Sequence, residues 1–119
     1  MIKLVQCVRK QPEIELLEFR NYWDEYRRMM ENAREVLGIS RVLFSTALAF
    51  EESFEVMLTR GTQVPYDGMV ELFFENATIF REVLAHPDTE ALLEEIRAFQ
   101  GEFMDLDASA FFFAINDGY

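Results

Sequence analysis

The feature that most constrains this chain is one unbroken run of helical spacing over residues 13–37. Apolar residues recur there at gaps of three and four, which places them along one stripe of a helix. The stripe consists of Leu16, Phe19, Trp23, Tyr26, Met30, Ala33 and Leu37. Gly38 follows directly, and glycine commonly ends helices because it adopts the left-handed conformation without strain. The pattern therefore predicts a helix from Glu13 to Leu37.

Alternating or densely apolar segments surround this helix. They predict strands over residues 2–9, 39–50, 69–75 and 108–115. Asn76 is the expected cap of a short helix ending at Ala85, and Asp88, after the break at Pro87, is the expected cap of the next helix. The stripe of that last helix contains Leu92, Ile96, Phe99 and Phe103.

The segment 51–65 is less determined by its pattern. Gly61 and Pro65 indicate a loop, whereas the run SFEVML fits either a short helix or an extension of the preceding strand. Both alternatives stay open at this point.

The order strand–helix–strand–strand–helix–helix–strand is typical of the α+β class. It predicts a ferredoxin-like sandwich, a four-stranded antiparallel sheet with helices on one face. The first, third and last predicted strands are apolar on both faces, although helices cover only one of them. We therefore expect the open face to pair with a second copy of the chain, sheet to sheet.

Size and composition limit the kinds of partner. The 119 residues predict a single domain, 1–119, and a net charge of −11 argues against nucleic acid or a membrane surface as a partner. Cys7 is the only cysteine, so no internal disulfide forms, and a reducing cytoplasmic setting is expected. Twelve phenylalanines are more rings than a small domain easily hides, which favours a large apolar interface or an apolar pocket.

Several short motifs together resemble one family. The pair Tyr22-Trp23 lies in the first helix, the segment YDGMVELFF spans residues 66–74, and Phe103-Met104-Asp105 precedes the last strand. In order and spacing the chain resembles an EthD-type protein of the dimeric α/β-barrel superfamily. The resemblance implies a ferredoxin-like protomer, a barrel formed by the sheets of two protomers, and a cleft between each sheet and its helices.

The resemblance also implies a class of function. Relatives in the superfamily include cofactor-free monooxygenases, together with isomerases, cyclases and dehydratases that act on small aromatic or cyclic compounds. Many relatives carry a histidine at the position of Arg27, and an arginine cannot serve as the base there. Two hypotheses therefore remain: a cofactor-free enzyme of isomerase, dehydratase or monooxygenase type, and a non-catalytic dimeric binding or structural module.

The first helix supplies three candidate site residues. Trp23 and Tyr26 are either core or the wall of a binding cleft, in which the Tyr26 hydroxyl would donate a hydrogen bond to a ligand. Arg27 is either a surface arginine paired with Asp24 or Glu31, or a cation at the cleft mouth that attracts a carboxylate or enolate.

The third strand supplies the remaining candidates. Glu71 interrupts an apolar strand and shares a face with Phe73. Burial there would raise the pKa of the Glu71 carboxyl group and make it a base. Glu71 is therefore one catalytic candidate, and Tyr26, through its hydroxyl group, is the other. The alternative is a glutamate paired with an arginine such as Arg9. His86, the only histidine, is expected at the surface, and the sequence contains no common zinc-binding pattern.

Overall fold

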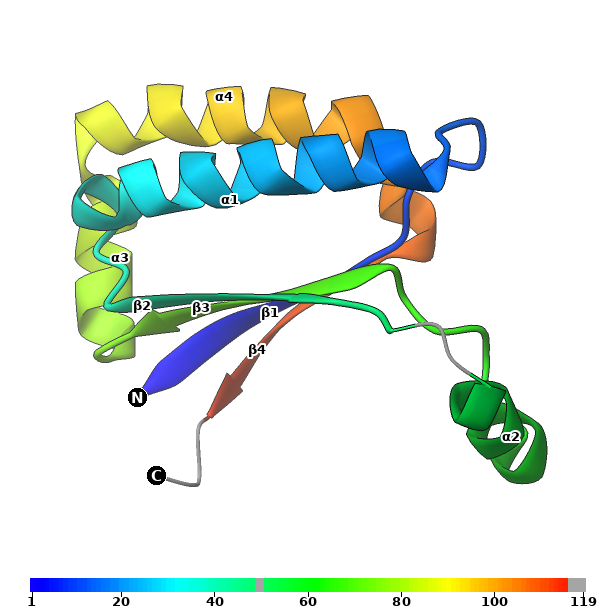
Figure 1. Ribbon diagram of the computed structural model, residues 1–119. Helices are drawn as coiled ribbons and strands as arrows, with labels where there is room; N and C mark the ends of the chain where they lie inside the picture. The colour runs from blue at the N-terminus through cyan, green and yellow to red at the C-terminus, as the bar shows by residue number, and fades with distance from the viewer. Residues whose placement is uncertain (49–50, 116–119) are drawn as a thin grey trace.

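The computed structural model describes residues 1–48 and 51–115, and these form a four-stranded antiparallel sheet in the order β2-β3-β1-β4 (Figure 1). The strands are β1 (Ile2–Val8), β2 (Arg41–Thr46), β3 (Gly68–Phe74) and β4 (Ala110–Ile115). The helices are α1 (Leu16–Leu37), α2 (Glu51–Arg60), α3 (Ala77–Ala85) and α4 (Pro87–Phe103), followed by the 3-10 turn η1 (Leu106–Ala108).

The predicted α+β sandwich is confirmed. Helices α1 and α4 lie side by side over one face of the sheet, and α3 stands across one end of it (Figure 1). Helix α2 projects from the opposite end, away from the helical layer, and carries the exposed side chains of Phe54, Val56 and Leu58. No helix in the described part of the chain combines the length and apolar character needed to span a bilayer.

Helix α1 follows the predicted stripe except at its first member, Leu16, which is exposed. Its buried side chains are Phe19, Trp23, Tyr26, Met30, Ala33 and Leu37. Gly38 ends it with φ of 67°, in the left-handed region, as expected. The predicted start at Glu13 is wrong, because residues 12–14 form a turn in which the Ile14 amide donates to the Gln11 carbonyl at 3.1 Å.

Other predicted boundaries need correction. Strand β2 ends at Thr46, earlier than the predicted end at residue 50, which lies outside the described residues. The undecided run SFEVML belongs to helix α2 and not to a strand. Strand β4 begins at Ala110, because η1 occupies the start of the predicted segment.

One predicted cap is confirmed and one is wrong. Asn76 caps α3, since its Oδ1 accepts from the Ile79 amide at 2.9 Å. The cap of α4 is His86, whose Nδ1 accepts from the Asp88 amide at 3.3 Å. Pro87 is the first helical residue, and this places Asp88 inside the first turn and not ahead of it.

The strand register divides the sheet residues between two faces. Leu4 pairs with Leu72 and Gln6 with Val70 on the helix-covered face, whereas Val5 pairs with Glu71 on the open face. Because side chains alternate along a strand, the open face also carries Lys3, Cys7, Phe73 and Phe112.

The open face is less uniformly apolar than the sequence pattern predicted. Lys3 Nζ and Glu71 Oε2 form a 2.7 Å ion pair across β1 and β3, and the Lys3 and Arg41 cations lie over the Phe73 ring. Apolar side chains surround this pair, among them the buried Val5 and the half-exposed Phe112. Among the described residues, the open face is therefore an apolar surface that carries the Lys3–Glu71 ion pair and the Arg41 cation.

Candidate functional site

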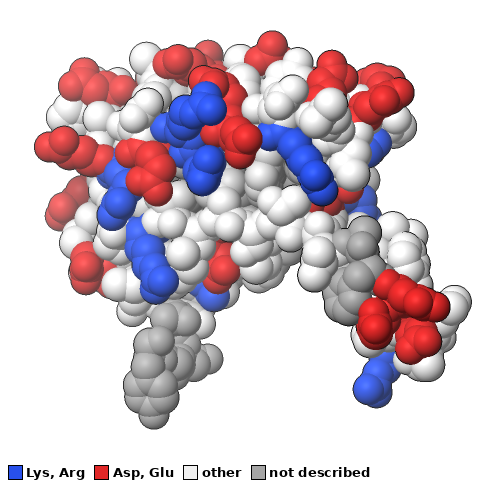
Figure 2. Space-filling model, in the orientation of Figure 1, with Lys and Arg blue, Asp and Glu red and all other residues white. Residues whose placement is uncertain are grey.

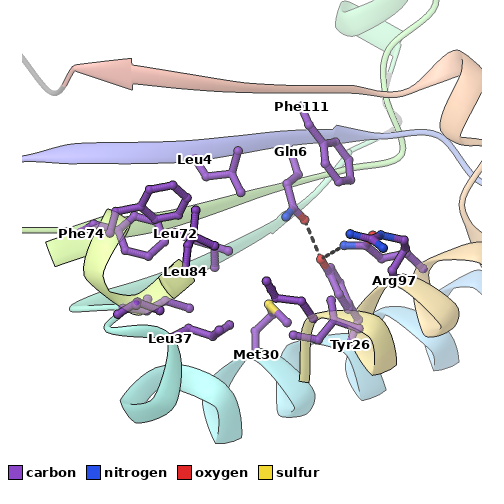
Figure 3. Close-up of a pocket in the computed structure, with 16 residues that line it drawn as sticks. Leu4, Gln6, Tyr26, Met30, Leu37, Leu72, Phe74, Leu84, Arg97 and Phe111 are labelled. Carbon is purple, nitrogen blue, oxygen red and sulfur yellow. Dashed lines mark hydrogen bonds between the residues drawn. The ribbon is translucent and has the colours of Figure 1, made fainter. Parts of the chain in front are cut away.

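A cavity of about 290 Å³ lies between the sheet and the helical layer (Figure 3). Its walls come from the helix-covered face of β1, β3 and β4 and from α1, α3 and α4. Most of the lining is aliphatic or aromatic, including Leu4, Met30, Leu72, Phe74, Phe80 and Ile96. Its volume is near the lower end of the range of about 300–1,000 Å³ that is usual for ligand pockets.

Polar side chains gather at one end of this cavity. The Tyr26 hydroxyl donates to Oε1 of Gln6 at 2.7 Å and accepts from Nε2 of Gln100 at 2.8 Å (Figure 3). The three residues come from α1, β1 and α4, and all three are buried. The two covering helices, α1 and α4, are thus both joined to strand β1 through the hydroxyl group of Tyr26.

The electrostatic state of Tyr26 follows from this burial. Removal from water disfavours the phenolate and raises the pKa of Tyr26 from 10.0 to about 12, while the hydrogen bonds with Gln100 and Gln6 act in the opposite direction. The hydroxyl is therefore protonated at neutral pH. It acts as a hydrogen-bond donor and not as a base.

Arg97 is the only charged side chain among the described residues that line the cavity. It lies on α4 at the same end as the Tyr26 hydroxyl (Figure 3). Leu84 and Phe111 also line the cavity and are 48% and 40% exposed, so the cavity opens to solvent beside α3 and β4.

Of the five residues predicted for a site, only Tyr26 lines this cavity. Trp23 packs in the core instead, where its ring contacts those of Phe19 and Phe44. The face of Trp23 lies so close to β3 that a Cβ added at Gly68 would stand 2.5 Å from its Cζ2 atom. Trp23 therefore fixes α1 on the sheet and does not face the cavity.

The remaining three predicted residues lie elsewhere. Glu71 and Phe73 are on the open face, so the sheet separates them from Tyr26. The partner of Glu71 is Lys3 and not the predicted Arg9, whose guanidinium donates to the Val64 and Ala108 carbonyls. Arg27 is exposed and 3.6 Å from Asp24, as its surface alternative predicted. The structure therefore does not bring these residues together.

Sequence reasoning missed Gln6, Gln100 and Arg97. Gln6 interrupts the apolar face formed by Ile2, Leu4 and Val8, and Gln100 follows Ile96 by one helical turn on the buried side of α4. A polar residue at an apolar position was the available signal for both glutamines. Arg97 gave no such signal, because an arginine on an exposed helix surface is ordinary.

Comparison with models of known protein families shows which family the chain belongs to. The model of the EthD domain matches residues 11–107. The chain belongs to the EthD domain family. The predicted resemblance is therefore confirmed over most of the chain, and a search of curated proteins found no match to add to it.

Solved structures with this fold cover nearly the whole chain. An EthD family protein from Bacillus halodurans has 12% identity and a TM-score of 0.59, with 98% of each chain covered. A dimeric protein of ferredoxin-like fold from Bacteroides fragilis has 9% identity and a TM-score of 0.62, covering 97% of this chain and 95% of its own. A dimeric ferredoxin-like protein from Thermobifida fusca has 13% identity and a TM-score of 0.61, covering 97% and 90%. At these identities the similarity shows the fold alone.

Proposed function

We propose that this EthD-family protein binds one small, mainly apolar molecule in the cavity beneath α1 and α4. The observation that carries the proposal is the contrast within the cavity, whose apolar walls end in the buried Gln6–Tyr26–Gln100 cluster. Ligand sites are commonly apolar pockets with a few convergent polar groups, which fix the orientation of the ligand.

The polar cluster has unused hydrogen-bonding capacity. Gln6 Nε2 and Gln100 Oε1 make no hydrogen bond to the described residues, although both side chains are buried. A ligand oxygen would accept from Gln6 Nε2, and a ligand hydroxyl would donate to Gln100 Oε1. The cluster therefore suits an aromatic or alicyclic molecule that bears an oxygen substituent.

A cofactor-free enzyme is the second candidate, favoured by the Tyr26 hydroxyl at the cavity wall. A carbonyl group held beside it would be polarised by a hydrogen bond from Gln6 Nε2, because the Tyr26 proton is already donated to Gln6 Oε1. Such polarisation is what an isomerisation or dehydration requires. The described lining, however, contains no carboxylate, histidine or cysteine to remove a proton, and Glu71 lies on the other face of the sheet. Binding is therefore the better-supported function. Catalysis would also require a base, and the ligand or the solvent would have to supply it.

We also propose that the open face of the sheet pairs with a second copy. The structural neighbours described as dimeric support this, and so do the solvent-accessible side chains of Leu43 and Phe112 on that face. The same face carries the free Cys7, which favours the reducing cytoplasm as the setting of the dimer.

A ligand screen tests the binding function. Small phenols, quinones, lactones and aromatic acids are added to the purified protein, and ligands are detected as increases in melting temperature, since binding to the folded state alone stabilises it. A Leu93→Trp substitution fills the cavity and should abolish every such increase. Leu92→Trp is the matched control, because Leu92 neighbours it on α4 but lines a different groove. No increase with any compound, or an equal response in both variants, would contradict the proposal.

A further inference from the structure

We infer that the ligand is a carboxylic acid with an apolar body, whose carboxylate pairs with Arg97 at the polar end of the cavity. This inference rests on the proposed binding function and names the chemical class of its ligand. It transfers to Arg97 the anion-binding role that the sequence suggested for Arg27, which is paired with Asp24 and does not line the cavity.

The first argument is that the side chain of Arg97 makes no ion pair or hydrogen bond with any described residue. Three arginines of α1 each pair with the carboxylate three residues earlier, and these pairs are Asp24–Arg27, Glu25–Arg28 and Glu31–Arg34. Arg97 has Glu94 at the same spacing on α4, yet no pair forms within 4.0 Å. Its guanidinium is thus available to a ligand.

The second argument is position. Arg97 and Gln100 stand one helical turn apart on α4, and Gln100 bonds the Tyr26 hydroxyl. The Arg97 side chain lies at that same polar end of the cavity (Figure 3). A ligand whose body fills the apolar part therefore directs its polar end toward Arg97 and the unpartnered Nε2 of Gln6.

The third argument is the match of charge and geometry. A guanidinium presents a planar fork of N–H groups that fits the two oxygens of a carboxylate. One arginine balances one negative charge, and the face in Figure 2 carries many acidic side chains along the helical layer, with lysines and arginines among them. The net charge of −11 opposes more highly charged ligands such as phosphate monoesters. A monoanion is therefore the expected ligand.

Calorimetric titration with matched probes tests this inference. The probes are 2-naphthoate and its neutral amide, 2-naphthamide, together with benzoate and benzamide and with 2-naphthyl phosphate. We expect each acid to bind at least about tenfold more tightly than its amide, as is usual for a hydrogen bond to a charged group. Arg97→Gln should remove that preference and leave the affinity for the amides unchanged. Arg81→Gln is the matched control, because Arg81 is exposed, unpaired among the described residues and outside the cavity lining.

The possible outcomes separate the two proposals. If the amides bind as tightly as the acids, or if Arg97→Gln and Arg81→Gln have equal effects, the role of Arg97 is wrong while the binding function stands. Tighter binding of 2-naphthyl phosphate than of 2-naphthoate would contradict the carboxylate assignment. If no member of either pair binds, both the inference and the binding function are contradicted.

Discussion

The hydroxyl of Tyr26 donates a 2.7 Å hydrogen bond to Oε1 of Gln6 and so joins the middle of α1 to the strand β1 beneath it. Both side chains are buried, and Gln100 of α4 completes the cluster by donating to the same hydroxyl at 2.8 Å. The Gln6–Tyr26–Gln100 cluster therefore holds both α1 and α4 to the sheet and forms the polar end of the cavity.

Removing the Tyr26 hydroxyl should destabilise the protein. Tyr26→Phe leaves Gln6 Oε1 and Gln100 Nε2 without their partner, and an unsatisfied buried polar group costs about 1–3 kcal/mol. Urea denaturation followed by tryptophan fluorescence measures the change in the free energy of unfolding. Tyr22→Phe is the control, since Tyr22 is only half buried and its hydroxyl makes no hydrogen bond to the described residues. Equal losses in the two variants would mean that the cluster contributes nothing.

The raised pKa of Tyr26 predicts a loss of stability in alkaline solution. Below pH 10 both folded and unfolded states keep the proton; between 10.0 and about 12 the unfolded state releases it first, so the free energy of unfolding falls as pH rises. The full pKa difference corresponds to about 3 kcal/mol. Urea denaturation over this pH window should show the stability advantage of the wild type over Tyr26→Phe shrinking, while other titrating groups cancel in the comparison. An advantage that stays constant with pH would contradict the burial of an un-ionised Tyr26.

Substitution by alanine should have opposite effects at two glycines, Gly68, which packs against Trp23, and Gly101, which has open space beside it. Gly68→Ala places a methyl group 2.5 Å from Trp23 Cζ2, and overpacking of this kind costs about 1–3 kcal/mol. Gly101→Ala meets nothing within 4 Å and lies inside α4, so it should stabilise by about 0.5–1 kcal/mol. Thermal or urea denaturation of the two variants measures both signs. A neutral Gly68→Ala would show that α1 is not fixed on the sheet by this contact.

The proposed pairing of open faces predicts a difference between two adjacent phenylalanines of β4. Phe112→Asp places a charge on the open face and should weaken dimer formation at least about tenfold, as loss of a central aromatic contact does in other interfaces. Phe113→Asp changes the helix-covered side of the same strand, and its effect on assembly should be smaller. Sedimentation analysis of both variants and the wild type measures the association. A monomeric wild type, or equal effects of both substitutions, contradicts the pairing.

The sequence determined much of the fold because its periodicity is strong. The stripe on α1 and the alternation of Val70, Leu72 and Phe74 against Met69, Glu71 and Phe73 both appear in the structure. Helix α2 was undecided because its apolar residues contact little of the body, so no core imposes a regular stripe on them.

The candidate site was predicted less completely. Alternation shows which residues share a face of a strand but not which face the helices cover. Sequence reasoning could therefore name Glu71 and Tyr26 as candidates for one site, although the sheet separates them. Tyr26 was found because it lies on the helical stripe. Its partners Gln6 and Gln100 are 20 and 74 residues away in sequence, and only the packing of three elements brings them to one hydroxyl.

Nuclear magnetic resonance of the glutamine side-chain amides tests the central claim most directly. With 15N-labelled protein, the compound that binds most tightly in the ligand screen is titrated while the amide signals of Gln6, Gln100 and the exposed Gln63 are followed. Ligand binding in the cavity predicts saturable shifts of the Gln6 and Gln100 signals, while that of Gln63 stays in place. Unmoved Gln6 and Gln100 signals at saturation would show that the ligand binds elsewhere and would contradict the account.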